Sequence, residues 1–134
     1  MPEYALFCPP SDTSPHVARD FVASVLRALR LDALVDAATL CTSELVTNAC
    51  VHAKGGGSAL WLSADPARVR VTVFDGDENL PVIRELTPDG GELGGRGLHL
   101  VDALTDGCWG TAPAAPEGKA VWFYLSAANP GLEA

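Results

Sequence analysis

Basic residues are scarce in this chain. Lys and Arg together number 9, against 17 Asp and Glu, and the formal net charge at pH 7 is −8. The few basic side chains are scattered along the sequence. Because binding to phosphate backbones or anionic membranes requires clustered Lys and Arg, we expect no nucleic-acid partner and no membrane partner.

Long apolar runs are also missing. No stretch approaches the roughly 18–20 apolar residues that span a bilayer, and the first residues lack the basic, apolar and small-residue pattern of a secretion signal. A cytoplasmic protein is therefore expected. The 134 residues predict a single domain, residues 1–134, because a domain typically holds roughly 100–150 residues.

Several familiar chemical motifs are absent as well. The four cysteines form no Cys-x-x-Cys pair and lack zinc-finger spacing with histidine, so reduced and mostly buried thiols are expected. No Lys-Ser/Thr follows the glycines, as it would in a P-loop. No catalytic Ser-His-Asp or Cys-His set can be recognised from the sequence positions, so other small-molecule enzymes are less favoured.

Hydrophobic periodicity indicates the fold. Helical spacing predicts helices at about residues 14–29, 32–53 and 97–104. Alternating or β-branched stretches predict strands at residues 4–8, 59–63 and 69–74, and a closing pair that brackets Gly110 to Gly118. The first helix should bury Val17, Phe21, Val25, Leu26 and Leu29. Short turns between adjacent strands predict an α+β fold, a two-layer sandwich with a mixed, mostly antiparallel sheet and helices on one face.

Polar residues interrupt the apolar face of the second helix. At about 100° per residue, Asn48 and His52 fall within the apolar arc and Glu44 lies on its edge. The arc consists of Leu34, Ala38, Cys41, Leu45 and Ala49. Burial of an unpaired amide or carboxylate costs on the order of 1–3 kcal/mol, so a bound ion or ligand is expected as partner.

The chemistry of this pair suits phosphoryl transfer. Magnesium prefers oxygen ligands and takes few of them from protein, and a carboxylate one turn away could orient water or accept a proton from an attacking hydroxyl. The alternative for Glu44 is a solvated charge at the helix edge. For His52 we favour the simpler interpretation of a partly buried histidine bonded to backbone.

Two further clusters carry possible binding groups. Asp75-Gly76 ends an apolar strand, where the carboxylate could accept a hydrogen bond from a ligand amine, although a lone Asp-Gly is often only a turn. The run Gly94-Gly95-Arg96-Gly97-Leu98 opens a helix and could present backbone N–H groups to phosphate, or be only a loop with a cap. Between Gly76 and Gly95 the chain holds five Gly, two Pro and five acidic residues, a composition and length typical of a functional loop.

Together these clusters resemble a known family. Glu44-x-x-x-Asn48-Ala49, Asp75-x-Asp77 and Gly95-Arg96-Gly97-Leu98 resemble the N, G1 and G2 boxes of the GHKL (Bergerat-fold, histidine kinase-like) ATPases, the group of gyrase B, histidine kinases and heat-shock chaperones. The resemblance spans nearly the whole chain. The chain looks most similar to stand-alone anti-sigma-factor serine kinases of the RsbW/SpoIIAB type, because of its small size and three sequences: Ser43-Glu-Leu-Val-Thr-Asn-Ala49, Gly94-Gly-Arg-Gly-Leu98 and Gly118-Lys-Ala-Val-Trp122.

The resemblance implies ATP and Mg²⁺ as cofactors and a role for each cluster. Glu44 would be the general base or water-orienting residue, Asn48 the magnesium ligand, and Asp75, followed by Gly76, the acceptor for the adenine amino group. Phosphate contacts would come from Gly94, Gly95, Arg96, Gly97 and Leu98. Residues of about 76–95 would form a mobile lid.

The resemblance also implies partners. We expect a protein serine kinase that phosphorylates a STAS-type anti-sigma-factor antagonist and sequesters a sigma factor. Relatives commonly form homodimers, and the sequence leaves the oligomeric state open. Two departures favour the alternative of a nucleotide-dependent regulatory module that transfers nothing: Asp77 replaces the second G1 glycine, and Ala120 stands where a Thr commonly helps to bind adenine. A more distant alternative is that the boxes have decayed and only a partner surface functions.

Overall fold

The computed structural model describes residues 2–52, 56–76, 93–114 and 118–127, without the side chains of residues 51, 52 and 93–97. The helices and strands in these ranges follow the order that the sequence predicts. They are β1 (Glu3–Cys8), α1 (Ser14–Ala28), the 3-10 helix η1 (Asp32–Leu34), α2 (Val35–His52), β2 (Ser58–Ala64), β3 (Arg68–Asp75), α3 (Leu93–Thr105), β4 (Trp109–Pro113) and β5 (Lys119–Ser126).

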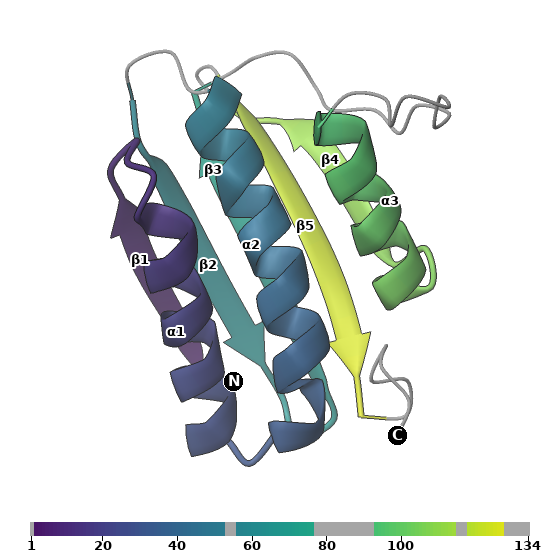
Figure 1. The fold of residues 1–134 in the computed structure, drawn as a ribbon. Helices are drawn as coiled ribbons and strands as arrows, with labels where there is room; N and C mark the ends of the chain where they lie inside the picture. The colour runs from purple at the N-terminus through teal and green to yellow at the C-terminus, as the bar shows by residue number, and fades with distance from the viewer. Residues whose placement is uncertain (1, 53–55, 77–92, 115–117, 128–134) are drawn as a thin grey trace.

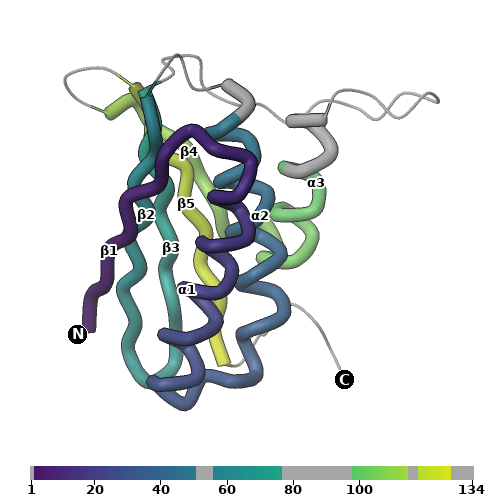
Figure 2. The backbone as a smooth tube through the Cα atoms, turned by 60° about the vertical axis from the view of Figure 1, so that its left-hand side comes forward, coloured from purple at the N-terminus to yellow at the C-terminus, as the bar shows by residue number. Residues whose placement is uncertain are grey.

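The strands form one sheet with the order β1-β2-β3-β5-β4. Every neighbouring pair among these strands is antiparallel, so no parallel pair appears in the part of the chain described. The three α-helices lie on one face of the sheet (Figures 1 and 2). The predicted α+β two-layer sandwich with helices on one face is confirmed, and its sheet is antiparallel rather than mixed.

The core lies between the helices and the sheet. Val69, Val71 and Val73 of β3 are buried, because alternate residues of a strand point to the same face. They are in register with buried residues of β5, Leu125, Phe123 and Val121. The helices close this core with Val22, Leu26, Leu34, Leu45, Val46, Leu98 and Val101.

The prediction for the buried face of α1 is partly wrong. Val17 is 48% exposed, whereas Ala18 and Val22 are fully buried. Val25 and Leu26 are buried as predicted. The apolar stripe is therefore rotated toward small residues, which allow α1 to pack closely against its neighbour α2.

Helix α3 begins earlier than the sequence predicts. It starts at Leu93 rather than at Gly97, so residues 93–95 of the predicted lid are helical. Residues 77–92 of that lid lie outside the described residues. At its other end, α3 is tied to β4, because Trp109 Nε1 donates a hydrogen bond of 2.9 Å to Asp102 Oδ1. None of the helices in the described ranges is long and apolar enough to cross a membrane.

Candidate functional site

Three segments that the sequence singles out meet at one end of the sandwich. The C-terminal end of α2, the C-terminal end of β3 and the N-terminal end of α3 lie at the same end of the molecule (Figure 1). Helix α2 contacts both α3 and β3. Antiparallel pairing with β3 brings the first residues of β5 to the same end. The fold thus gathers segments that are far apart in the sequence, from the end of α2 at His52 to the start of β5 at Lys119.

Helix α2 contributes Glu44 and Asn48 from its second half. The neighbouring apolar positions Cys41, Leu45 and Ala49 are buried, as the periodicity predicts. Glu44 and Asn48 themselves are only partly buried. Water can therefore reach both groups, and burial alone does not force a ligand on them, contrary to our expectation. The Glu44 carboxylate and the Asn48 amide instead lie one turn apart in the second half of α2, and both residues are partly exposed.

The carboxylate at the end of β3 has a partner that the motifs do not predict. Lys119 Nζ lies 3.0 Å from Asp75 Oδ1, and both side chains are almost fully buried, with exposures of 4% and 3%. Asp75 and Lys119 are direct neighbours across the β3–β5 ladder. A carboxylate can accept about four hydrogen bonds, so one ion pair does not saturate a carboxylate.

The same register corrects the expectation for Ala120. Ala120 pairs with Phe74, and successive side chains of a strand point to opposite faces of a sheet. Ala120 therefore lies on the face that the helices leave open, while Lys119 lies beside Asp75. Lys119 is the residue of β5 that pairs with Asp75.

A signal for Lys119 was present in the sequence. Lys119 is in phase with Val121, Phe123 and Leu125, which face the core. A lysine in phase with a buried strand face needs a buried acidic partner. The partner could not be named without the pairing of β3 with β5.

Backbone packing holds this corner of the site in place. Gly118 precedes Lys119 and has φ +107°, a conformation that side chains disfavour. A Cβ atom at Gly118 would collide with the carbonyl oxygen of Asp75. Glycine thus allows β5 to start directly against the end of β3, which brings Lys119 opposite Asp75.

The glycine-rich run lies within α3 rather than in a loop before it. Gly94, Gly95, Arg96 and Gly97 occupy the first turns of the helix, where the first four N–H groups have no intrahelical acceptor. Such a helix end favours anions. Leu98 is buried and belongs to the core, so its side chain anchors the start of α3 and only its backbone could contact a ligand.

The cysteines form no disulfide, as expected. Cys8 and Cys41 are buried and Cys50 is partly buried, but Cys108 is exposed. Burial, with a smaller effect of the Glu44 carboxylate, raises the pKa of the Cys41 thiol to about 12. Among the described residues no group of three or more His, Cys, Asp or Glu side chains could hold a metal ion.

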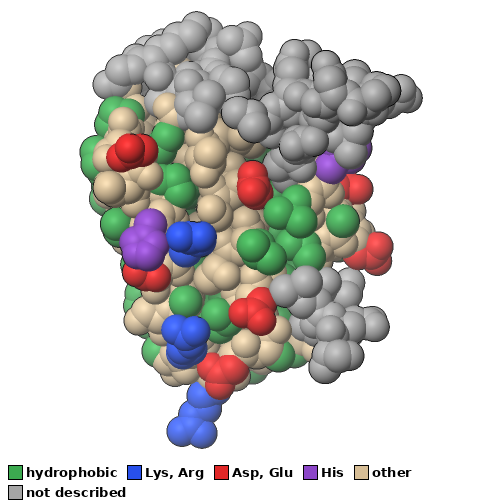
Figure 3. Space-filling model, in the orientation of Figure 1, with side chains coloured by type: hydrophobic (Ala, Val, Ile, Leu, Met, Phe, Trp, Pro, Cys, Tyr) green, Lys and Arg blue, Asp and Glu red, His purple; other side chains and the backbone are tan. Residues whose placement is uncertain are grey.

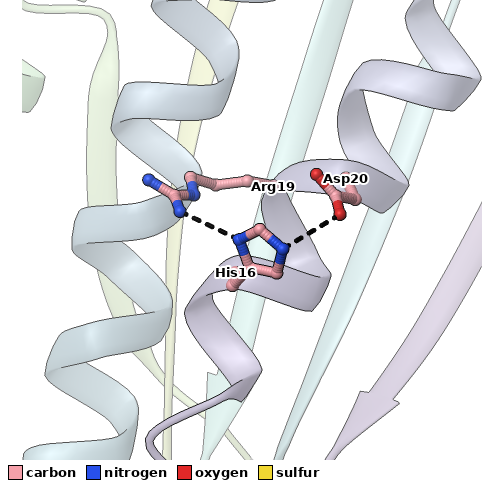
Figure 4. Close-up of polar contacts among 3 residues, drawn as sticks. All are labelled: His16, Arg19 and Asp20. Atoms are coloured by element: carbon pink, nitrogen blue, oxygen red, sulfur yellow. Dashed lines mark hydrogen bonds and ion pairs between the residues drawn. The ribbon is translucent and has the colours of Figure 1, made fainter.

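A second polar cluster lies on the outer surface of α1. His16 Nε2 is 3.3 Å from Asp20 Oδ2, and Arg19 Nη2 is 3.2 Å from His16 Nδ1 (Figure 4). The pair His16–Asp20 is well exposed, and exposed pairs of this kind contribute little to stability. On the helix side of the molecule the basic side chains gather over α1 and its C-terminal end, whereas acidic ones are spread out (Figure 3). Nothing in this cluster points to a ligand.

Comparison with known families agrees with this geometry. The sequence profile of the histidine kinase-like ATPase domain matches residues 8–125. The chain therefore belongs to the histidine kinase-like ATPase domain family, of the GHKL type, and this membership supports ATP binding. Comparison with curated proteins finds no match. The family match covers the domain as a whole and does not distinguish the anti-sigma-factor kinases within it.

Proposed function

We propose that this protein is a cytoplasmic, Mg-ATP-dependent protein serine kinase that phosphorylates an anti-sigma-factor antagonist and also sequesters a sigma factor. The observation that carries the proposal is the meeting of three segments at one end of a histidine kinase-like ATPase domain: α2 with Glu44 and Asn48, β3 with Asp75, and the first turns of α3.

The chemistry of the donor groups fits magnesium. Asn48 offers one amide oxygen, and Mg²⁺ takes few protein ligands because substrate phosphates and water complete its octahedron. The metal would neutralise charge on the phosphates. Glu44 stands one turn earlier on the same helix and is partly exposed, which suits a group that accepts a proton from an incoming serine hydroxyl.

The two remaining segments would bind the ends of the nucleotide. The N–H groups in the first turns of α3 suit the phosphates, and Asp75 suits the amino group of the base. Lys119 is a donor beside this acceptor. An ammonium group next to a carboxylate complements the edge of adenine, which has an amino donor beside a ring nitrogen acceptor.

Binding is tested by thermal melts with and without Mg-ATP. A ligand that binds only the folded state stabilises it by about 2.7 kcal/mol at a hundredfold excess over Kd. We expect a clear rise in Tm for the wild type and a much smaller rise for Asn48→Ala. Thr47→Ala, at an exposed neighbouring position of α2, is the matched control and should respond as the wild type does.

Transfer is tested with γ-labelled ATP, magnesium and a STAS-type antagonist protein. We expect labelling of a serine on the antagonist and its loss in Glu44→Ala. If Mg-ATP raises Tm but the wild type labels no better than Glu44→Ala, the kinase proposal is wrong. The second candidate, a regulatory module that binds nucleotide and transfers nothing, then takes its place.

A specific observation favours this second candidate. Asp77, two positions after Asp75 in the sequence, adds a negative charge where the family commonly has glycine. This charge weakens the affinity for the base. If millimolar Mg-ATP leaves Tm unchanged, neither candidate holds, and the protein functions through protein contacts alone.

A further inference from the structure

The face of the sheet opposite the helices carries an unusual set of side chains. We call it the open face. Figure 2 shows all three α-helices on the other side of the sheet. Because side chains alternate along a strand, Arg68, Arg70 and Phe74 of β3 project on the open face with Trp122 and Tyr124 of β5. None of the described helices covers this face.

Large aromatic side chains are exposed on the open face. Trp61 is 45% exposed, Phe74 38% and Phe7, on the edge strand β1, 78%. The residues that line a hollow of about 340 Å³ include Trp61, Phe74, Trp122, Arg70 and Glu3. A large exposed apolar patch of this kind usually marks an interaction site.

Two arginines lie on the aromatic rings. The guanidinium of Arg68 is 4.8 Å from the ring centre of Tyr124, and that of Arg70 is 5.3 Å and 5.4 Å from the rings of Tyr124 and Trp122. Stacking uses the flat face of a guanidinium and leaves its in-plane N–H groups for a carboxylate. Although the chain has 17 acidic residues, neither arginine forms an ion pair with any described residue.

The aromatic rings are held in place. A Cβ atom at Gly110 would come within 2.5 Å of the Trp122 ring, so the ring lies directly on the backbone of β4. Trp61 Nε1 donates a hydrogen bond of 3.3 Å to Glu3 Oε1. Side chains that are already ordered lose little entropy on binding. Trp, Tyr and Arg are also the residue types that dominate binding energy at protein interfaces.

We propose that the open face binds an acidic segment of a partner protein, in which carboxylates alternate with aromatic or large aliphatic side chains. The carboxylates pair with Arg68 and Arg70, and the apolar groups enter the hollow between Trp61, Phe74 and Trp122. Charge complementarity favours this partner. The two stacked guanidinium groups form no ion pair with a described carboxylate, and Glu3 is the one acidic residue among those that line the hollow. This proposal goes beyond the nucleotide site and does not depend on it.

Other occupants fit this face less well. Nucleic acid carries a phosphate with every base and needs a longer basic track, whereas two carboxylates suffice for two arginines. A second copy that docks through its own open face would bring arginine against arginine. The acidic side chain described at the hollow of that face is Glu3, which already accepts a hydrogen bond from Trp61. The net negative charge of the chain would repel an acidic peptide. This repulsion is weak for charges far from the open face, because electrostatic interactions are screened beyond roughly 8–10 Å at physiological salt.

The proposal is tested by selecting from random 12-residue peptides displayed on phage, with the wild type as bait. We expect enriched peptides to be acidic and rich in aromatic or aliphatic residues. Binding of the best synthetic peptide, followed by tryptophan fluorescence, should weaken at least tenfold in Arg68→Glu/Arg70→Glu and with increasing salt. Asn48→Ala should bind as the wild type does, so that failure of the nucleotide site is distinguished from failure of the open face.

The matched control is Arg19→Glu/Arg27→Glu, which reverses two exposed charges on α1 and should leave peptide binding unchanged. Circular dichroism is used to check that both double variants are folded. The proposal is overturned if no peptide is enriched, if enriched peptides carry no excess of acid, or if Arg68→Glu/Arg70→Glu binds them equally well. It is also overturned if sedimentation shows a dimer that this variant abolishes, or if single-stranded oligonucleotides bind more tightly than the peptides.

Discussion

Removal of the Lys119 ammonium should destabilise the protein strongly. In Lys119→Met the side chain keeps its length, but its ion pair with the Asp75 carboxylate, 97% buried, is lost. At the observed separation of 3.0 Å, Coulomb's law with an effective dielectric constant of about 20 gives an attraction of roughly 5 kcal/mol. Loss of one partner of a buried pair costs about 3–5 kcal/mol in measured cases. We expect a loss in that range.

The assay is thermal and urea unfolding followed by far-UV circular dichroism. For a chain of 134 residues, a loss of about 3–5 kcal/mol corresponds to a decrease in Tm of roughly 10–20 °C. Arg27→Met, which removes an exposed cation on α1, is the control and should change stability by less than about 0.5 kcal/mol.

A double-mutant cycle separates the ion pair from packing. Asp75→Asn should also destabilise, because it leaves the ammonium without its carboxylate. Lys119→Met/Asp75→Asn should lose less than the sum of the two single variants, with a coupling energy of at least about 2 kcal/mol. Additive effects, or a loss below about 1 kcal/mol in Lys119→Met, would refute the interpretation that a buried ion pair organises this end of the sheet.

Four further predictions follow from packing and burial in the fold. The Thr42 hydroxyl is buried and has no described hydrogen-bond partner, so Thr42→Val should raise the free energy of unfolding by about 1 kcal/mol. If urea denaturation instead shows a lower free energy of unfolding for this variant, the hydroxyl has a partner. Gly118→Ala should lower stability by about 2–4 kcal/mol in the same assay, because φ is +107° and the Cβ atom meets Asp75; a neutral effect would contradict this close approach. In the native protein a thiol reagent should label exposed Cys108 rapidly and buried Cys41 slowly, as read by peptide mass spectrometry. The folded-state pKa of Cys41, about 12 against an ordinary 9.0, stabilises the folded state fully below pH 9 and should lose that contribution as pH rises from 9 toward 12; a flat stability profile there would contradict it.

Local periodicity predicted much of the fold. The alternation of Val69, Val71 and Val73 gave the buried face of β3, and the arc through Leu45 and Ala49 gave the buried face of α2. The same reasoning was wrong for Val17, because the choice between two adjacent apolar stripes depends on what α1 packs against. Small residues mark a close helix contact only when the neighbour is known.

The candidate site was predicted less completely. The motifs named Glu44, Asn48 and Asp75, and the fold brings the ends of their elements to one end of the molecule. They missed Lys119 and assigned importance to Ala120, which faces the other side of the sheet. The roles of Glu44, Asn48 and the glycines of α3 stay predictions.

The sequence by itself determined the order of the elements, the buried faces of α2 and β3, and the family, because each depends on spacing within a short window or on motifs that can be read along the chain. Only the tertiary structure decided that β5 lies between β3 and β4. That placement puts Lys119 against Asp75, 44 positions away, and stacks Arg70 on Trp122. Strand register across such distances is set by packing of the whole sheet against its helices, and no local pattern encodes it.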